Sequence, residues 1–308
     1  MALKNDTYFK EFILLGLSST PNVQHILFVI FLIMYLAILL ANSLIILATV
    51  MDSKLHTPMY FFLINLSFVD ICYSSSTIPR MLRDLSSAKK TISFEECVTQ
   101  MYIALSLGMT ECLLLAIMAY DRYIAICFPL HHTSTIATTV CIRIATAAWV
   151  SGFLLSISLV TLTWSVDLCG HNNINHFMCE VPEVLSLGCG NVAVVRSVVF
   201  AAAVLILVIP VTFITVTYIK IIRAILKIST MEGRKKAFST CGSHIIVVTL
   251  FYGSAMAAYM RPQSESSADI DKLFGIFYCL VTPLLNPLVY TLRNKEVISA
   301  LKLHWLKQ

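Results

Sequence analysis

The sequence predicts an all-α membrane protein that folds as a bundle of seven transmembrane helices. Of its 308 residues, 58% are hydrophobic and 13% are charged, whereas soluble domains contain about 45–50% and about 25%. Repeated apolar runs approach the roughly 20 residues that a helix needs to cross a bilayer. Because a helix satisfies its own backbone hydrogen bonds in lipid, these runs and the mean hydropathy of +0.82 favour helices over a barrel.

The predicted spans follow one another along the chain, and polar segments with turn residues and charges separate them. They cover residues 26–50, 58–78, 98–127, 139–164, 194–222, 237–259 and 270–292. Among the connections, only the one at 165–193 is long. No internal repeat, linker or low-complexity tract divides the sequence, so we expect a single domain over residues 1–308.

The distribution of Lys and Arg predicts the orientation of the bundle. Basic residues follow the fifth span and occupy the C-terminal tail, as Lys220, Arg223, Lys227, Arg234, Lys235, Lys236, Arg293, Lys295, Lys302 and Lys307, whereas residues 165–193 contain none. Since basic loops favour the cytoplasm, we expect the tail 1–24 and the loop 165–193 outside and the tail 293–308 inside. One predicted outer loop disagrees, because it holds Arg80, Arg83, Lys89 and Lys90 beside Asp84, Glu95 and Glu96.

The segments expected outside carry covalent signals. Asn5 begins an Asn-Asp-Thr triplet, which predicts N-glycosylation. Four cysteines would lie on the oxidising face, where disulfides form, and they allow three pairings: Cys97, Cys169, Cys179 and Cys189. The alternative is a metal site made of Cys169, His171, His176 and Cys179, but their irregular spacing and the oxidising compartment favour disulfides.

Two carboxylates lie inside predicted spans, where a charge costs at least about 2.5–3.5 kcal/mol. Asp70 and Glu111 can both face the bundle interior, with Asn42 and Asn286 as polar neighbours. Such a cluster could hold Na⁺ or share a proton, and we expect no other cofactor. The alternative interpretation is a polar contact that only orients the helices.

The inner end of the third span carries a second charged pair. Asp121 directly precedes Arg122, so the carboxylate could hold the guanidinium until a partner binds it, as a latch. The alternative is an arginine that merely extends to the membrane surface. Pro210, Pro283 and Pro287 lie within spans, where a missing backbone donor allows a helix to kink.

Taken together, these motifs resemble those of the rhodopsin-like G-protein-coupled receptors over nearly the whole chain. The shared residues occur in order on successive spans: Asn42, Leu66-Ser67-Phe68-Val69-Asp70, Cys97, Asp121-Arg122-Tyr123, Pro210 with Tyr218, and Asn286-Pro287-Leu288-Val289-Tyr290. Within that class, four longer strings are similar to vertebrate odorant receptors: Pro58 to Leu63, Met118 to Cys127, Lys236 to His244 and Pro283 to Pro287. Mild departures are Ala41, where Gly usually precedes the Asn, and Thr217, where Ser usually precedes the Tyr.

The resemblance implies a multi-pass receptor in the plasma membrane of olfactory cilia, which binds small volatile molecules. It further implies coupling to an olfactory stimulatory G protein that raises cyclic AMP. The disulfides would be Cys97–Cys179 and Cys169–Cys189. Arg122 would contact the G protein after release from Asp121, within a coupling set that comprises Asp121, Arg122, Tyr123, Tyr218, His244, Asn286, Pro287 and Tyr290.

Helical spacing predicts the ligand pocket in the outer half of the bundle. The third span would contribute Ala104, Leu105, Gly108, Met109 and Cys112, and the other walls would be Val199, Ala202, Ala203, Ile206, Tyr252, Ala255, Met256, Tyr259, Ile276 and Cys279. This lining is mostly apolar, with tyrosine hydroxyls and Thr110 as polar groups, and suits a small uncharged molecule. Ala104 stands where amine receptors of this class carry Asp, and the middle of the seventh span has no Lys to bind retinal, since Lys272 lies at its outer end.

Other functions fit the sequence less well. A rhodopsin-like receptor for a metabolite in another tissue is the first alternative, because tissue is not encoded in these residues. A channel or transporter would show paired repeats or a continuous polar stripe, and neither is present. No triad, phosphate loop or metal-ligand set indicates an enzyme, and no basic tail indicates a nucleic-acid partner.

Overall fold

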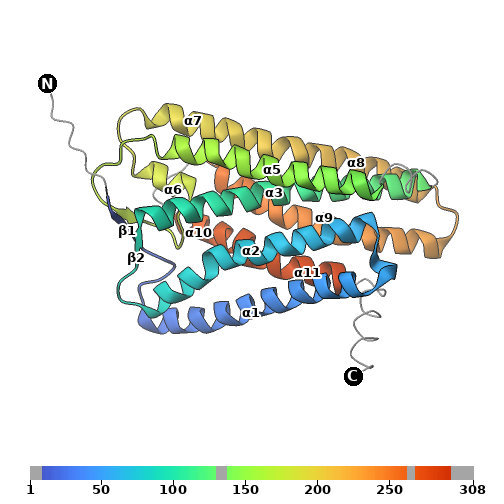
Figure 1. The fold of residues 1–308 in the computed structure, drawn as a ribbon, viewed down its shortest axis with the longest axis horizontal. Coiled ribbons are helices and arrows are strands. Elements are labelled where there is room, and N and C mark those ends of the chain that lie inside the picture. Colours follow the sequence, from blue (N-terminus) through green and yellow to red (C-terminus); the bar gives the residue numbers. More distant parts are fainter. Residues whose placement is uncertain (1–8, 130–136, 262–267, 293–308) are drawn as a thin grey trace.

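The computed structural model describes residues 9–129, 137–261 and 268–292, and within them seven helical segments are long and apolar enough to cross a membrane. They lie side by side along the long axis of the molecule (Figure 1). The predicted fold class is therefore confirmed. The segments are α1 (Pro21–Met51), α2 (Pro58–Ser86), α3 (Phe94–Cys127), α5 (Thr138–Thr163), α7 (Val192–Ala203) continued through η3 (Val204–Val208) and α8 (Ile209–Leu226), α9 (Met231–Tyr259), and α10 (Ala268–Ile276) continued through η5 (Phe277–Val281) and α11 (Thr282–Leu292).

Local signals explain where several helices begin. Pro21 and Pro58 occupy the first turns of α1 and α2, where a missing N–H has no cost. α3 begins with a capping box, in which the Ser93 hydroxyl accepts from the Glu96 N–H at 3.2 Å and the Glu96 carboxylate accepts from the Ser93 N–H at 3.2 Å. A short 3₁₀ turn, η1 (Ser53–Leu55), connects α1 to α2.

The third span is the centre of the bundle. α3 packs against α2, α5 and α8, and its buried side chains extend from Cys97 to Ile124. The spans at the periphery of the bundle instead expose large apolar side chains, such as Leu36 at 56%, Leu154 at 60% and Leu205 at 59%. So wide an apolar surface suits contact with lipid.

Two spans widen into π-helical turns just before a proline. η3 ends two residues before Pro210, and η5 ends two residues before Pro283. Proline has no N–H and its ring crowds the preceding turn, so the regular i→i−4 hydrogen bonds of the backbone are replaced there by the wider spacing of a π-helix. Pro287 lies inside α11 without such a turn. The widened turns supply residues to the cavity described below.

The end of the bundle at which α1 begins contains three short strands, which the sequence did not predict. β1 (Glu11–Leu14) pairs antiparallel with β2 (Thr91–Ser93) and parallel with β3 (Asn173–Ile174). Phe12 and Leu14 are fully buried beneath this sheet. The tail predicted at 1–24 is thus folded onto the loops from residue 11, and α1 begins within it. Asn5 and the tail 293–308 lie outside the described residues.

The predicted outer loop from Arg80 to Glu95 is wrong, because α2 continues to Ser86. Arg80 consequently lies on a helix, where its guanidinium pairs with Asp84 at 3.2 Å and Glu96 at 3.1 Å. Its charge, which disagreed with the predicted orientation, is neutralised by these two carboxylates. The loop expected up to Lys236 is also shorter than predicted, since α9 begins at Met231.

Candidate functional site

A cavity opens in the half of the bundle nearest the sheet. Its cavity volume is about 80 Å³. Residues from six spans and the loop before α7 line it: Tyr73, Ala104, Leu105, Gly108, Met109, Cys112, Leu159, Val181, Val199, Ala203, Ile206, Leu207, Phe251, Ala255, Tyr259 and Tyr278. None of these lining residues is charged, and their polar groups are tyrosine hydroxyls and one thiol.

The structure brings ten of the predicted pocket residues to this cavity: Ala104, Leu105, Gly108, Met109, Cys112, Val199, Ala203, Ile206, Ala255 and Tyr259. Regular helical spacing explains why the five α3 positions lie together, because α3 presents one continuous stripe to the space. The positions that belong to π-helical or neighbouring turns were harder to predict, since their angular spacing departs from that of an α-helix.

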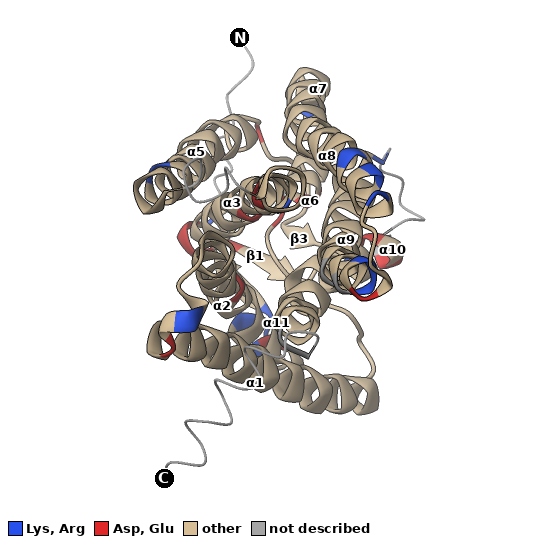
Figure 2. Cartoon of the chain, turned by 90° about the vertical axis from the view of Figure 1, so that its right-hand side faces the viewer, with Lys and Arg blue, Asp and Glu red and all other residues tan. Residues whose placement is uncertain are grey.

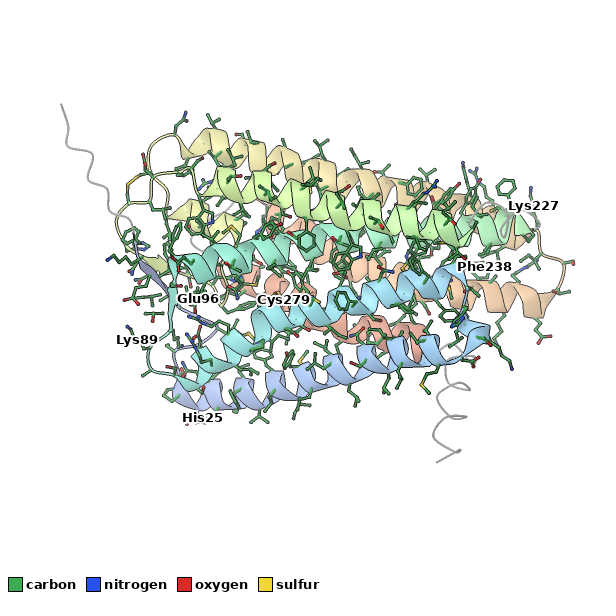
Figure 3. The ribbon with its side chains drawn as sticks, in the orientation of Figure 1. His25, Lys89, Glu96, Lys227, Phe238 and Cys279 are labelled. Carbon is green, nitrogen blue, oxygen red and sulfur yellow. A yellow bond between two sulfur atoms is a disulfide. The ribbon has the colours of Figure 1, made fainter. Side chains whose placement is uncertain are left out.

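Five predicted residues do not line the cavity: Ala202, Tyr252, Met256, Ile276 and Cys279. The Tyr252 hydroxyl donates instead to the backbone carbonyl of Cys112 at 2.7 Å, which buries the ring in the core. The Cys279 thiol faces the Met178 sulfur at 3.5 Å and the Tyr73 hydroxyl at 3.7 Å. Figure 3 shows Cys279 inside the bundle. Ala202, Met256 and Ile276 are half-buried on other faces of their helices.

The predicted polar group Thr110 is also misplaced. Its hydroxyl donates to the Ser106 carbonyl at 2.8 Å, and the side chain faces Gly152 of α5 rather than the cavity. The residues that the sequence reasoning missed are Tyr73, Leu159, Val181, Leu207, Phe251 and Tyr278. Val181 had a usable signal, because it follows Cys179 by two residues and any disulfide from that cysteine to α3 would place it over the pocket.

The long loop between α5 and α7 lies at the sheet end of the bundle and is held there covalently. Disulfides join Cys97 to Cys179 and Cys169 to Cys189, the pairings that the resemblance implies. The Cys179 N–H also donates to the Gln100 side chain at 2.9 Å. The alternative metal site is wrong, because both of its cysteines are in disulfides. The described ranges also contain no group of three His, Cys, Asp or Glu residues that could hold a metal ion.

The loop carries a buried acid beside the cavity. Glu180 directly precedes α6 (Val181–Ser186), and one of its carboxyl oxygens accepts a hydrogen bond from the Tyr278 hydroxyl. Burial raises the pKa of Glu180 to about 8; the bond from Tyr278 opposes this rise, and the charges of Glu183 and Asp271 add to it. Burial and the charge of Lys272 lower the pKa of the neighbouring His176 to about 3. Both side chains are therefore mainly neutral at pH 7.

A polar core lies deeper in the bundle. The Asn286 amide donates to both Asp70 oxygens, at 3.1 and 3.0 Å, and to Glu111 at 3.4 Å. All three side chains are buried. Asn42, predicted as a fourth member, instead donates to the carbonyls of Ile38 and Pro283, at 3.0 and 3.1 Å, and so ties α1 to α11.

The predicted coupling residues divide into groups. Tyr218 and His244 share a hydrogen bond of 2.8 Å between the hydroxyl and Nδ1, and Tyr290 packs against His244 with ring centroids 6.5 Å apart. The charge of Arg122 acts on all three side chains. Tyr123 lies apart, with the Lys220 ammonium 5.5 Å from its ring centroid. Asn286 belongs to the polar core, and Pro287 lies next to it in α11.

Arg122 is buried, and its Nε has no hydrogen-bond partner among the described residues. Among the residues that the structure describes, no ion pair within 4 Å joins this guanidinium to Asp121. Adjacent residues on a helix project about 100° apart, which separates the two side chains.

A seven-helix membrane bundle with a cavity near the sheet, a polar core and a buried arginine cluster at the opposite end defines a transmembrane receptor. The profile of the family described as "Olfactory receptor" matches residues 31–308. The chain is 48% identical to human olfactory receptor 2B2 over 97% of its own length and 84% of that protein. It is 47% identical to human olfactory receptor 13D1, over its full length and 90% of that protein. The mouse olfactory receptor 2B6 is likewise 47% identical, over 98% of this chain and 96% of that protein.

The chain belongs to the olfactory receptor family. It is therefore a multi-pass protein of the plasma membrane and an odorant receptor, not an enzyme.

Proposed function

We propose that the chain binds a small volatile molecule in the outer cavity and activates an olfactory stimulatory G protein, which raises cyclic AMP in sensory cilia. The cavity itself is the observation that carries this proposal, because its lining is apolar apart from tyrosine hydroxyls and a thiol. A lining of this kind favours compact molecules with little charge. Since such a ligand has few atoms, its affinity is modest.

We further propose that the sheet end of the bundle is extracellular. This assigns residues 1–24 and 165–193 to the outside and 293–308 to the cytoplasm, within one domain over 1–308. Two disulfides lie at the sheet end, as expected for an oxidising compartment. Figure 2 views the bundle from the opposite end, where Lys and Arg cluster on α8 and α9. Figure 3 places Lys227 at that end and Lys89 with Glu96 at the other.

Coupling then requires that the ligand bind one arrangement of the spans more tightly than another. The Tyr252 hydroxyl connects α9 to the backbone of Cys112, a residue that lines the cavity, at 2.7 Å. Further along the same helix, His244 bonds to Tyr218 and lies within the field of Arg122. A ligand that shifts α9 relative to α3 therefore alters the surroundings of Arg122, which we propose then contacts the G protein.

The test is a cyclic AMP reporter assay with a chemically diverse odorant panel in cells that express the receptor. Arg122→Ala should abolish the response to any agonist while surface expression is retained. Arg143→Ala is the matched control, because this arginine is exposed on α5. Undiminished signalling by Arg122→Ala would refute the coupling proposal.

The position of the ligand is tested separately. Met109→Ala and Tyr259→Phe change two residues that line the cavity, so each should shift agonist potency or change the order of preferred odorants. If neither variant altered any response, the proposed pocket would be wrong.

A further inference from the structure

The polar groups of the cavity are gathered rather than scattered. Tyr73 from α2, Tyr259 from α9 and Tyr278 from η5 all line the space, and the Glu180 carboxyl acts electrostatically on all three hydroxyls. The remaining lining, apart from the Cys112 thiol, is apolar. The cavity therefore has one polar end and an apolar body.

The hydrogen bonds within this end decide what each hydroxyl can offer a ligand. Tyr278 donates its proton to Glu180, which leaves its oxygen as an acceptor. Tyr73 accepts from the Cys279 thiol at 3.7 Å, so its own proton is free to donate. No hydrogen bond to another described residue engages the Tyr259 hydroxyl. Two free donors and one acceptor thus face the same space.

The electrostatic surroundings disfavour charged ligands. The charges that act on Glu180 from the described residues are the carboxylates of Glu183 and Asp271, and no cation is among them. The neutral form of Glu180 is favoured there, as its raised pKa also indicates. A protonated amine would find no formal negative charge, and a carboxylate ligand would find no cation in the lining.

We propose that Tyr73, Tyr259 and Tyr278 form a polar pole that selects neutral oxygenated ligands, chiefly aldehydes and ketones, whose carbonyl oxygen accepts hydrogen bonds from Tyr73 and Tyr259. Glu180 is a positioning residue, because it orients the Tyr278 hydroxyl and does not itself line the cavity. The apolar chain of such a ligand extends toward Met109 and Ile206. This inference rests on the proposed function in that it takes the cavity to be the ligand site.

The decisive experiment measures binding, separately from signalling. Purified receptor is heated with straight-chain aldehydes of five to ten carbons, and with alkanes, carboxylic acids and primary amines of the same lengths. We expect aldehydes to raise the melting temperature most. Tyr73→Phe and Tyr259→Phe should each weaken aldehyde binding about tenfold, equivalent to about 1.4 kcal/mol, and leave alkane binding unchanged. Tyr102→Phe is the control, because this ring packs on Phe153 and does not line the cavity.

Glu180→Gln tests the positioning role, with Glu183→Gln as its control. The amide still accepts from Tyr278, so Glu180→Gln should keep the preference for aldehydes over alkanes, whereas Glu180→Leu, which removes the acceptor, should reduce it. A general loss of stability would not change this ratio. Alkanes or amines that bind as well as aldehydes, or phenylalanine variants that behave like Tyr102→Phe, would overturn the polar pole. Aldehyde binding without any cyclic AMP response would refute the signalling proposal and leave this inference standing.

Discussion

The side-chain amide of Asn286 donates to both carboxyl oxygens of Asp70, at 3.1 and 3.0 Å, although 216 residues separate them in sequence. The same amide reaches Glu111 at 3.4 Å. One nitrogen therefore connects α11, α2 and α3. Two buried acids that share a single donor depend on it, because an unsatisfied polar group is costly away from water.

Asn286→Ala should destabilise the receptor by about 1–3 kcal/mol, since it removes the donor shared by two buried carboxyls. The thermal midpoint of the purified protein measures this. The exposed Asn175→Ala is the control. The exchange variant Asp70→Asn with Asn286→Asp re-creates an amide beside a carboxyl and should recover part of the loss. No recovery, together with a midpoint unchanged in Asn286→Ala, would contradict this role.

Gly152→Ala should destabilise the contact between α3 and α5. A β-carbon there would lie 2.4 Å from the Thr110 hydroxyl and 2.8 Å from the Ser106 carbonyl, so one helix must move. Overpacking of this kind costs about 1–3 kcal/mol, which outweighs the gain of up to about 1 kcal/mol from replacing a helical glycine. Gly253→Ala meets no atom within 4 Å and should be neutral or stabilising. Equal thermal midpoints for the two variants would argue against close packing at Gly152.

Phe12→Ala should weaken the outer sheet strongly, although the residue lies in what the sequence presents as a tail. Its ring is fully buried and packs against Trp164, with centroids 5.8 Å apart. Removal of a buried phenylalanine costs about 3–5 kcal/mol. Surface expression and the thermal midpoint should both fall. Leu15→Ala, on a side chain that is 43% exposed, should change neither; a comparable fall in that variant would mean that the segment is merely sensitive to change.

Stability should fall between pH 7 and pH 8 because of Glu180. Its pKa rises from 4.5 to about 8 on folding, so the folded state holds more protons in this window and the free energy of unfolding decreases as pH rises. The slope is at most about 1.4 kcal/mol per pH unit for one group. Melting curves across this range measure it, and Glu180→Gln should flatten the profile.

Neighbouring titratable groups change the stability mainly below pH 7, so the range from pH 7 to 8 isolates the effect of Glu180. The pKa of Glu183 rises to about 7, mainly through burial, so its contribution is largely lost by pH 7. The pKa of His176 falls to about 3, so this group makes stability rise with pH only up to its usual 6.5. A slope between pH 7 and 8 that persists in Glu180→Gln would show that another group carries it.

Much of the architecture follows from local chemistry. The spans are long apolar runs, and a helix in lipid must satisfy its own backbone wherever such a run occurs. Their number, their order and the α3 stripe from Ala104 to Cys112 could therefore be predicted. Helix ends were less predictable: Arg80 looked like a loop residue, because its pairing with Glu96 involves a partner beyond the end of the helix.

The contacts between distant segments could not be read from residue types. Whether Phe12 is buried depends on strands that meet only when the tail and two loops converge. Whether Cys279 lines the cavity depends on a π-helical turn, which rotates it toward Met178 and brings Tyr278 to the lining instead. Hydrophobic periodicity assumes a regular helix and so carries no information about such a rotation.

Composition and span length predicted the seven-helix bundle, because membrane insertion depends on the apolar runs themselves. The receptor class and the two disulfide pairings came from the resemblance of the ordered motifs to a known family. The tertiary structure alone decided that Asn286 serves two acids, that the Arg122 Nε is buried without a hydrogen-bond partner among the described residues, and that three tyrosines meet beside Glu180. These outcomes depend on how neighbouring spans rotate and pack, which is determined by the close fit of side chains across the whole bundle.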